Sequence, residues 1–261
     1  MFTKRQRLIA LAYGVACHLS FAIGIAAMIA GLYFGMRIGR GPFTGAEGIF
    51  FDLVLLAQFA ILHSFLLSAR GRGILAKLVP GGIGGHMTTT TFALVSSLQI
   101  ALTFLAWSPI GDVWWEPHGM LRGVVSVAYA ASWVLLMKSM RDAGLEIQTG
   151  SLGWTAVARG RAPQYRDFPT RGLFRYIRQP IYLAFTLTLW TGPVWTPDHL
   201  LIAALWTLYC IVGPALKERR YLGYYGARFQ RYRELVPYWV PSSQKLDPAH
   251  LTSNSPSGVH S

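Results

Sequence analysis

Residues 8–35 read LIALAYGVACHLSFAIGIAAMIAGLYFG, an apolar run that only His18 and small polar residues interrupt. A helix needs about 20 apolar residues to cross about 30 Å of hydrocarbon, so this run is long enough to span a membrane. It is too long for the apolar part of a signal peptide and lacks a cleavage-site pattern, which predicts a retained span.

Four more apolar blocks follow along the chain, at residues 49–68, 88–107, 124–140 and 181–216. Pro193, Pro197 and Asp198 divide the last block, which we therefore expect to form a helical hairpin with two short arms. The pattern predicts an all-α polytopic membrane protein with about six transmembrane helices, of which the last two form the hairpin.

Composition agrees with a membrane protein. Hydrophobic residues make up 52% of the chain and charged residues 13%, about half the usual share in soluble proteins. The net charge of +13 would suit nucleic acid, but the charges lie between apolar runs, so we expect the lipid bilayer as a partner and no nucleic acid. Cys17 and Cys210 lie inside apolar runs and are predicted to be buried free thiols. The seven histidines are scattered, which predicts no metal site.

The distribution of positive charge predicts the orientation. With the N-terminus in the cytoplasm, 21 of the 24 lysine and arginine residues fall on the cytoplasmic side, and only Arg37, Arg40 and Arg122 fall outside. Cytoplasmic segments of membrane proteins carry an excess of these residues. Both termini are therefore predicted to be cytoplasmic.

Two cytoplasmic segments are too long to be simple connections. One covers residues 141–179, and the other begins at Lys217 and reaches Pro241. We expect residues 1–241 to form a single membrane domain and residues 242–261, rich in Ser, Pro and His, to be a disordered tail.

The densest polar motif is RGLFRYIRQPIY, residues 171–182, at the start of the hairpin. Its arginines and the free N–H groups of the first turn of the following helix can bind an anionic group. The alternative is anchoring to anionic lipid head groups. A second cluster, residues 217–241, is basic and aromatic, and on physical grounds alone an interfacial amphipathic helix explains it.

The order of these motifs resembles the isoprenylcysteine carboxyl methyltransferase superfamily. The resemblance covers about residues 171–241 and rests on R-x-P-x-Y, then E-R, then Y-x-x-Y-Y-G-x-x-F-x-x-Y and V-P-x-x-x-P. It implies that this half of the chain binds S-adenosylmethionine in a cytosolic pocket made by the hairpin and the tail.

The N-terminal half is similar to the bacterial branch that contains methanethiol S-methyltransferases and NnrU-type proteins. The segments that carry this likeness are QFAILHS (58–64), Arg70, KLVP (77–80), SSL (96–98) and WSPI (107–110). The likeness implies methyl transfer to a small lipophilic thiol, methanethiol giving dimethyl sulfide, in the bacterial inner membrane.

Two positions depart from the superfamily pattern. Gln179 stands where the superfamily has His, and a glutamine cannot accept a proton at neutral pH. Lys217 stands where relatives have the first Glu of a pair, so that Glu218 is the one carboxylate left. We expect the cofactor site to be kept despite these departures, whereas the identity of the methyl acceptor does not follow from the resemblance.

The resemblance also implies roles for single residues. The donor's carboxylate suits Arg178 or Arg228, and its ammonium and ribose hydroxyls suit Glu218. Arg219 is either another partner of the donor's carboxylate or an ion-pair partner of Glu218. The further residues expected at the cofactor site are Tyr176, Gln179, Pro180, Tyr182 and Tyr232.

No residue is an evident base for the thiol. The catalytic candidates are His63, in the second span, and Gln179, in the place of the family His. The alternative for His63 is a neutral ring bonded to another span, to Gln99 or to a threonine of residues 88–91.

Two other functions remain open from the sequence. The acceptor can be a larger lipophilic carboxylate, thiol or amine, or the chain can be a non-catalytic NnrU-like membrane protein. The sequence does not set the oligomeric state.

Overall fold

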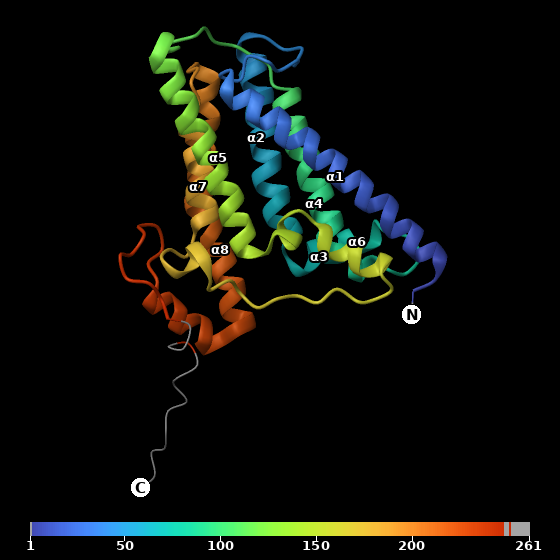
Figure 1. Cartoon of the computed structure of the whole chain (residues 1–261). Helices are drawn as coiled ribbons and strands as arrows, with labels where there is room; N and C mark the ends of the chain where they lie inside the picture. The colour runs from blue at the N-terminus through green and yellow to red at the C-terminus, as the bar shows by residue number, and fades with distance from the viewer. Residues whose placement is uncertain (1, 248–250, 252–261) are drawn as a thin grey trace.

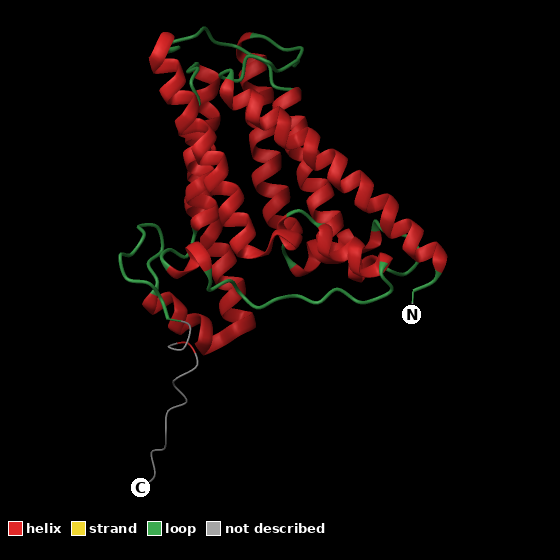
Figure 2. Ribbon diagram, in the orientation of Figure 1, coloured by secondary structure: helices red, strands yellow, loops and turns green. Residues whose placement is uncertain are grey.

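The computed structural model describes residues 2–247 and 251, and this part of the chain is helical (Figures 1 and 2). The helices are α1 (Lys4–Tyr33), α2 (Gly45–Leu66), α3 (Ala69–Lys77), α4 (Gly84–Leu105), α5 (Gly119–Gln148), α6 (Ser151–Ala158), the 3₁₀ helix η1 (Gly172–Arg175), α7 (Pro180–Trp190) and α8 (Pro197–Leu235).

Five of these helices, α1, α2, α4, α5 and α8, are long and apolar enough to cross a membrane. Many of their large apolar side chains are exposed, among them Leu8, Val15, Ile61 and Val127. A soluble protein rarely exposes large continuous apolar surfaces, because they would contact water. The chain is therefore an integral membrane protein, as its composition predicts.

The first arm of the predicted hairpin differs from a full span. Helix α7 has 11 residues, which at about 1.5 Å each is about half of a membrane crossing. It begins with Pro180, which suits the first helical turn, and residues 191–196 continue without helical structure. That segment is largely buried, as non-helical backbone at membrane depth must be.

The helices form two groups that separate toward one end of the molecule. Helix α1 lies along α4, α5 lies beside α7, and α7 lies beside α8, as Figure 1 shows. The main apolar core joins α1, α2, α4, α7 and α8 around Phe104, Trp107 and Trp206. The N-terminus, α3, α6, η1 and the last part of α8 all lie at the same end of the molecule.

Helix α8 is bent within its 39 residues. Gly226 has non-helical backbone angles, with φ of 51°, a value that favours glycine. The bend turns residues 227–235 back against the chain before η1, where Phe229, Tyr232 and Val236 pack on Phe168. The bend therefore builds a small aromatic core at this end of the molecule.

Ser242 and Leu246, in the first part of the predicted disordered tail, form hydrogen bonds with the rest of the fold. The backbone N–H of Ser242 donates to the carbonyl of Tyr176, and the N–H of Leu246 donates to the carbonyl of Arg175. Leu246 is buried in the same aromatic core. A single apolar residue in a polar tail is not enough to predict this contact from the sequence. Residues 248–250 and 252–261 of the predicted tail lie outside the described residues.

Candidate functional site

The predicted motif 171–182 is held by backbone contacts on both sides. Gly172 has a φ of 58° and lies so close to the Asp142 carboxylate that a Cβ would not fit. Asp142 accepts a hydrogen bond from the backbone N–H of Leu173 at 2.8 Å. The N–H of Arg178 donates to the carbonyl of Pro237 at 3.0 Å. The start of α7 is thus fixed between α5 and the segment that follows α8.

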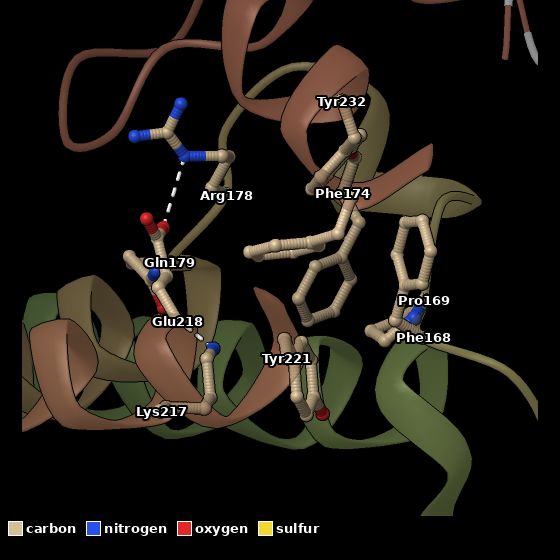
Figure 3. A pocket seen from close by; sticks show the side chains of 10 residues that line it. Phe168, Pro169, Phe174, Arg178, Gln179, Lys217, Glu218, Tyr221 and Tyr232 are labelled. Atoms are coloured by element: carbon tan, nitrogen blue, oxygen red, sulfur yellow. Dashed lines mark hydrogen bonds and ion pairs between the residues drawn. The ribbon is translucent and has the colours of Figure 1, made fainter. Parts of the chain in front are cut away.

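These contacts enclose a pocket between the hairpin and the bent end of α8 (Figure 3). Charged and amide side chains lie on one side of it and aromatic rings on the other. The lining residues are Phe168, Pro169, Phe174, Arg178, Gln179, Lys217, Glu218, Tyr221, Phe229 and Tyr232.

Glu218 is the centre of the charged side. Its side chain is 5% exposed, and its Oε1 lies 3.0 Å from Nε of Arg178. Its Oε2 lies 3.1 Å from Nε of Arg233, which comes from beyond the bend in α8. A buried carboxylate needs such partners, because burial without them costs several kcal/mol. Two guanidinium groups therefore hold one carboxylate at the pocket wall.

Arg178 also ties the pocket to the segment after α8. Its Nη1 donates to the carbonyl of Val236 at 2.9 Å and also to the carbonyl of Arg233. Its guanidinium lies over the ring of Tyr238, with 5.3 Å between Cζ and the ring centroid. A planar fork with several donors suits this combined role better than an ammonium does.

Gln179 links the acidic Glu218 to the basic Lys217. It is 1% exposed, its Nε2 donates to Oε1 of Glu218 at 2.7 Å, and its Oε1 accepts from Nζ of Lys217 at 2.6 Å. Its amide orientation is set by chemistry, since a carboxylate only accepts hydrogen bonds and an ammonium only donates them. The glutamine in place of the family histidine is thus a bridge between Glu218 and Lys217.

Aromatic rings form the opposite wall. Phe168 contacts Phe229 and Tyr232, with ring centroids 5.2 and 5.5 Å apart. The hydroxyl of Tyr232 donates to the carbonyl of Phe174 at 2.8 Å, which fixes the ring against the pocket. Flat apolar walls of this kind suit the face of a planar ring in a ligand.

The structure brings Arg178, Gln179, Glu218 and Tyr232 together at the pocket, as the sequence predicts for its cofactor site. Two more predicted residues lie directly beside it. Tyr182 presents its ring to Nζ of Lys217 at 5.3 Å, and Pro180 begins α7 next to Gln179.

Four further predicted residues are also not among those that line the pocket. Arg219 is exposed, Arg228 pairs with Asp167, and the carbonyl of Tyr176 accepts from the N–H of Ser242. The fourth, His63, is in α2, where its Nδ1 lies 3.1 Å from the hydroxyl of Ser96 and its ring contacts Phe59 and Phe92. The alternative that the sequence leaves open for His63 is a neutral ring bonded to another span. The structure places such a partner on α4, and it is Ser96 rather than Gln99 or a threonine of residues 88–91.

Several residues at the site are not among the binding residues that the sequence predicts, and Lys217, Arg233 and Phe168 are three of them. In the sequence, Lys217 is only a departure from the family pattern. Arg233 lies two turns past the bend at Gly226. A glycine in a long helical segment is the sequence feature that could have indicated that the chain turns back and brings Arg233 to the site. Phe168 is followed by Pro169 in an arginine-rich loop. An apolar aromatic side chain in such a polar loop indicates that it packs against another part of the protein.

The side chains that line the pocket suit, in chemical kind, a ligand that carries both charges and a planar ring. Guanidinium groups suit a carboxylate, Glu218 suits an ammonium or hydroxyl groups, and the aromatic wall suits the ring. Within the described residues, no group of three or more His, Cys, Asp and Glu side chains is placed to hold a metal ion.

Comparison with known proteins gives several relatives. The chain is 32% identical over 247 residues to methanethiol S-methyltransferase 1 of Bradyrhizobium diazoefficiens, covering 90% of this chain and 83% of that protein. It is 25% identical to the methanethiol S-methyltransferase of Crocosphaera subtropica, over 90% of this chain and 93% of that one. A more distant relative is the nurim homologue of Drosophila melanogaster, 27% identical over 64% of this chain and 67% of that protein. No family model and no solved structure matches.

Proposed function

The chain belongs to the methanethiol S-methyltransferase family, and on that premise we propose that it transfers a methyl group from S-adenosylmethionine to methanethiol, giving dimethyl sulfide. The observation that carries the proposal is the relative with 32% identity over 90% of the chain. The pocket adds a site of suitable chemistry in the same half of the chain that the superfamily uses for its cofactor.

The residues of the pocket fit this donor in kind. S-adenosylmethionine carries a carboxylate, an ammonium, ribose hydroxyls and a planar adenine. The charged side offers Arg178 for the carboxylate and Glu218 for the ammonium or the hydroxyls. Phe168, Tyr221 and Tyr232 offer ring faces for the adenine.

We propose that this end of the molecule faces the cytoplasm of a bacterial cell. The 21 basic residues of the sequence analysis belong to the segments that Figure 1 shows at the end with α3, α6 and η1. We take residues 197–216 as the membrane-crossing part of α8, about 30 Å of helix. Lys217 and the residues after it are then outside the hydrocarbon, at the pocket. Cysteines introduced at Arg72 and at Ser243 should be labelled only after the inner membrane is opened.

The contribution of the protein to this reaction is mainly position and exclusion of water. The donor, when bound, supplies a methyl group on a positively charged sulfur. Arg178 and Glu218 would hold the ends of the donor, and the aromatic wall would keep water away from the reacting atoms. A small thiol dissolves in the bilayer and can arrive from the side of Tyr182 and the apolar hairpin.

Headspace gas chromatography tests the proposed function. Cells that express the chain and receive methanethiol should release dimethyl sulfide, while cells with the empty vector should not. Lys245→Gln, which changes an exposed residue, should behave like the wild type. Equal amounts of dimethyl sulfide from the vector control and the expressing cells would contradict the proposal.

A further inference from the structure

Lys217 differs from the other basic groups of the pocket in its partner. Arg178 and Arg233 both form ion pairs with Glu218, whereas Nζ of Lys217 donates to the neutral amide oxygen of Gln179 at 2.6 Å. The same ammonium lies 5.3 Å from the ring centroid of Tyr182 and 5.9 Å from that of Tyr221. In the described part of the chain no carboxylate forms an ion pair with it.

The surroundings of Lys217 disfavour its charged form. Burial among α7 and α8 lowers the pKa of Lys217 to about 8, and the positive charges of Arg220 and Arg178 lower it further, while Glu218 acts in the opposite direction. The other titratable groups beside it are the hydroxyls of Tyr182 and Tyr221. A partly buried lysine that loses its proton this easily can serve as a base near neutral pH.

The position of Lys217 suits a proton acceptor for a lipophilic thiol. It is the first charged residue after the apolar part of α8, and it lines the pocket together with Gln179 and Glu218. One side of its ammonium faces polar groups and the other faces Tyr182 of the hairpin. The alternative base, His63, is bonded to Ser96 and is not among the lining residues.

We propose that Lys217, in its neutral form, is the catalytic base that takes the proton from the thiol acceptor. The S–H bond of the thiol breaks and an N–H bond forms on Lys217, leaving a thiolate, which is the reactive form of a thiol. The thiolate sulfur then forms a bond to the methyl carbon, whose bond to the donor sulfur breaks. The donor becomes a neutral thioether, and the proton on Lys217 leaves to water.

This assignment rests on the proposed function, and it explains how a lysine can act beside a cationic donor. A sulfonium and an ammonium repel each other in a site of low polarity. Binding of the donor therefore favours loss of the proton from Lys217, which produces the base before the thiol reacts. A lysine that instead bound the donor's carboxylate would keep its proton.

Proton release on binding tests the assignment without measuring turnover. S-adenosylmethionine is titrated into the purified protein by calorimetry at about pH 7, in two buffers of different ionisation enthalpy. We expect the wild type to release most of one proton per site, because a group with a pKa of about 8 is largely protonated at that pH. Lys217→Met and Lys217→Gln should release almost none, and Lys77→Met, at an exposed position, should match the wild type. S-adenosylhomocysteine, which lacks the sulfonium charge, should release far less from the wild type.

The pH–rate profile with methanethiol is the second measurement. For the wild type with the donor at saturation, kcat/KM for methanethiol should rise with pH and level off below pH 8, because the bound donor lowers the pKa of Lys217 below its value of about 8 in the free protein. Both Lys217 variants should be slower by about a hundredfold at neutral pH, and their rates should keep rising with pH because only thiolate formed in solution reacts. Lys217→Gln keeps a hydrogen-bond donor to Gln179. If its unfolding temperature matches that of the wild type, its slower rate comes from the lost base and not from a loss of structure.

The outcomes separate the two proposals. If the wild type does not bind S-adenosylmethionine, the proposed function itself fails. If it binds and methylates, but the Lys217 variants release the same proton or keep the wild-type pH profile, only the base assignment fails. A loss confined to donor affinity would make Lys217 a ligand of the donor's carboxylate and would also overturn the assignment.

Discussion

Helix α8 carries two buried carboxylates, Asp198 in its first turn and Glu218 near its middle, and their surroundings differ. Asp198 is 1% exposed and accepts from Nε1 of Trp107 at 2.9 Å and from the backbone N–H of Gly111 at 3.0 Å. These donors are neutral. Glu218 is 5% exposed, and two of its partners, Arg178 and Arg233, are guanidinium groups.

The difference separates a carboxylate held by neutral donors from the carboxylate that we propose to bind the donor. Asp198 closes the loop after α4 onto the start of α8, where the helix dipole favours a negative charge. Glu218 instead brings two cations and an amide to the wall of a pocket whose other side is aromatic. Burial alone therefore does not identify a functional carboxylate, whereas charged partners at a pocket do.

The largest effect is expected from Glu218→Gln. The change leaves two guanidinium groups facing a neutral amide and removes a partner of the donor. Affinity for S-adenosylmethionine, measured by calorimetry, should fall about ten- to a hundredfold, or about 1.5–3 kcal/mol. Stability should fall by about 3 kcal/mol or more, because a buried ion pair is broken.

Glu234→Gln is the matched control for this change. Glu234 is a half-exposed carboxylate on the same helix and pairs with Arg231 at 3.2 Å. Its loss should cost less than about 1 kcal/mol and leave donor affinity unchanged. Equal donor affinity of Glu218→Gln and the wild type would remove Glu218 from the binding site.

Asp198→Asn should have the second largest effect, and on stability alone. The N–H donors of Ile110 and Gly111 would then share one carbonyl oxygen or face an NH₂ group. We expect a loss of about 1.5–3 kcal/mol by unfolding in detergent, with donor affinity as in the wild type. Asp112→Asn, at an exposed neighbour, is the control. A loss of donor affinity in Asp198→Asn would show that the two ends of α8 are coupled.

Gln179→His should add a pH dependence that the wild type lacks. A neutral imidazole can donate to Glu218 and accept from Lys217, but an imidazolium cannot accept. Below about pH 6.5, the ordinary pKa of histidine, donor affinity should fall about tenfold relative to the wild type at the same pH. Calorimetry at pH values on both sides of that value measures this. Parallel affinities of the two proteins at every pH would mean that the bridge at residue 179 does not contribute to binding.

Trp107→Phe should have the smallest effect. It removes one of the donors to Asp198 and keeps the aromatic packing, so we expect a loss of about 1 kcal/mol in unfolding and no change in donor affinity. Trp114→Phe, at an exposed position, should be neutral. A loss of stability as large as that of Asp198→Asn would mean that the hydrogen bond from Trp107 accounts for the entire stabilising effect of Asp198.

Several features of this protein are set by local sequence. The apolar runs place the five long helices, because about 20 apolar residues in a row have few stable alternatives to crossing a membrane. Pro180, Pro193 and Pro197 mark where α7 begins and where the hairpin turns. Arg178 and Glu218 are expected at the cofactor site because the resemblance to the superfamily implies it, and the hairpin brings the two residues together because each sits at one of its ends.

The partners at the site were decided by the tertiary structure. Arg219 follows Glu218 directly, yet neighbours on a helix point about 100° apart and do not face each other. Arg233 is 15 residues further on, and it reaches Glu218 because the backbone bends at Gly226. In the same way Lys217 is defined by the rings and the amide that enclose it, and these come from both arms of the hairpin. The sequence by itself determined which residues are apolar or charged and where helices run. Only the folded chain decided which charges are paired, because pairing depends on distances between segments that a linear pattern does not contain.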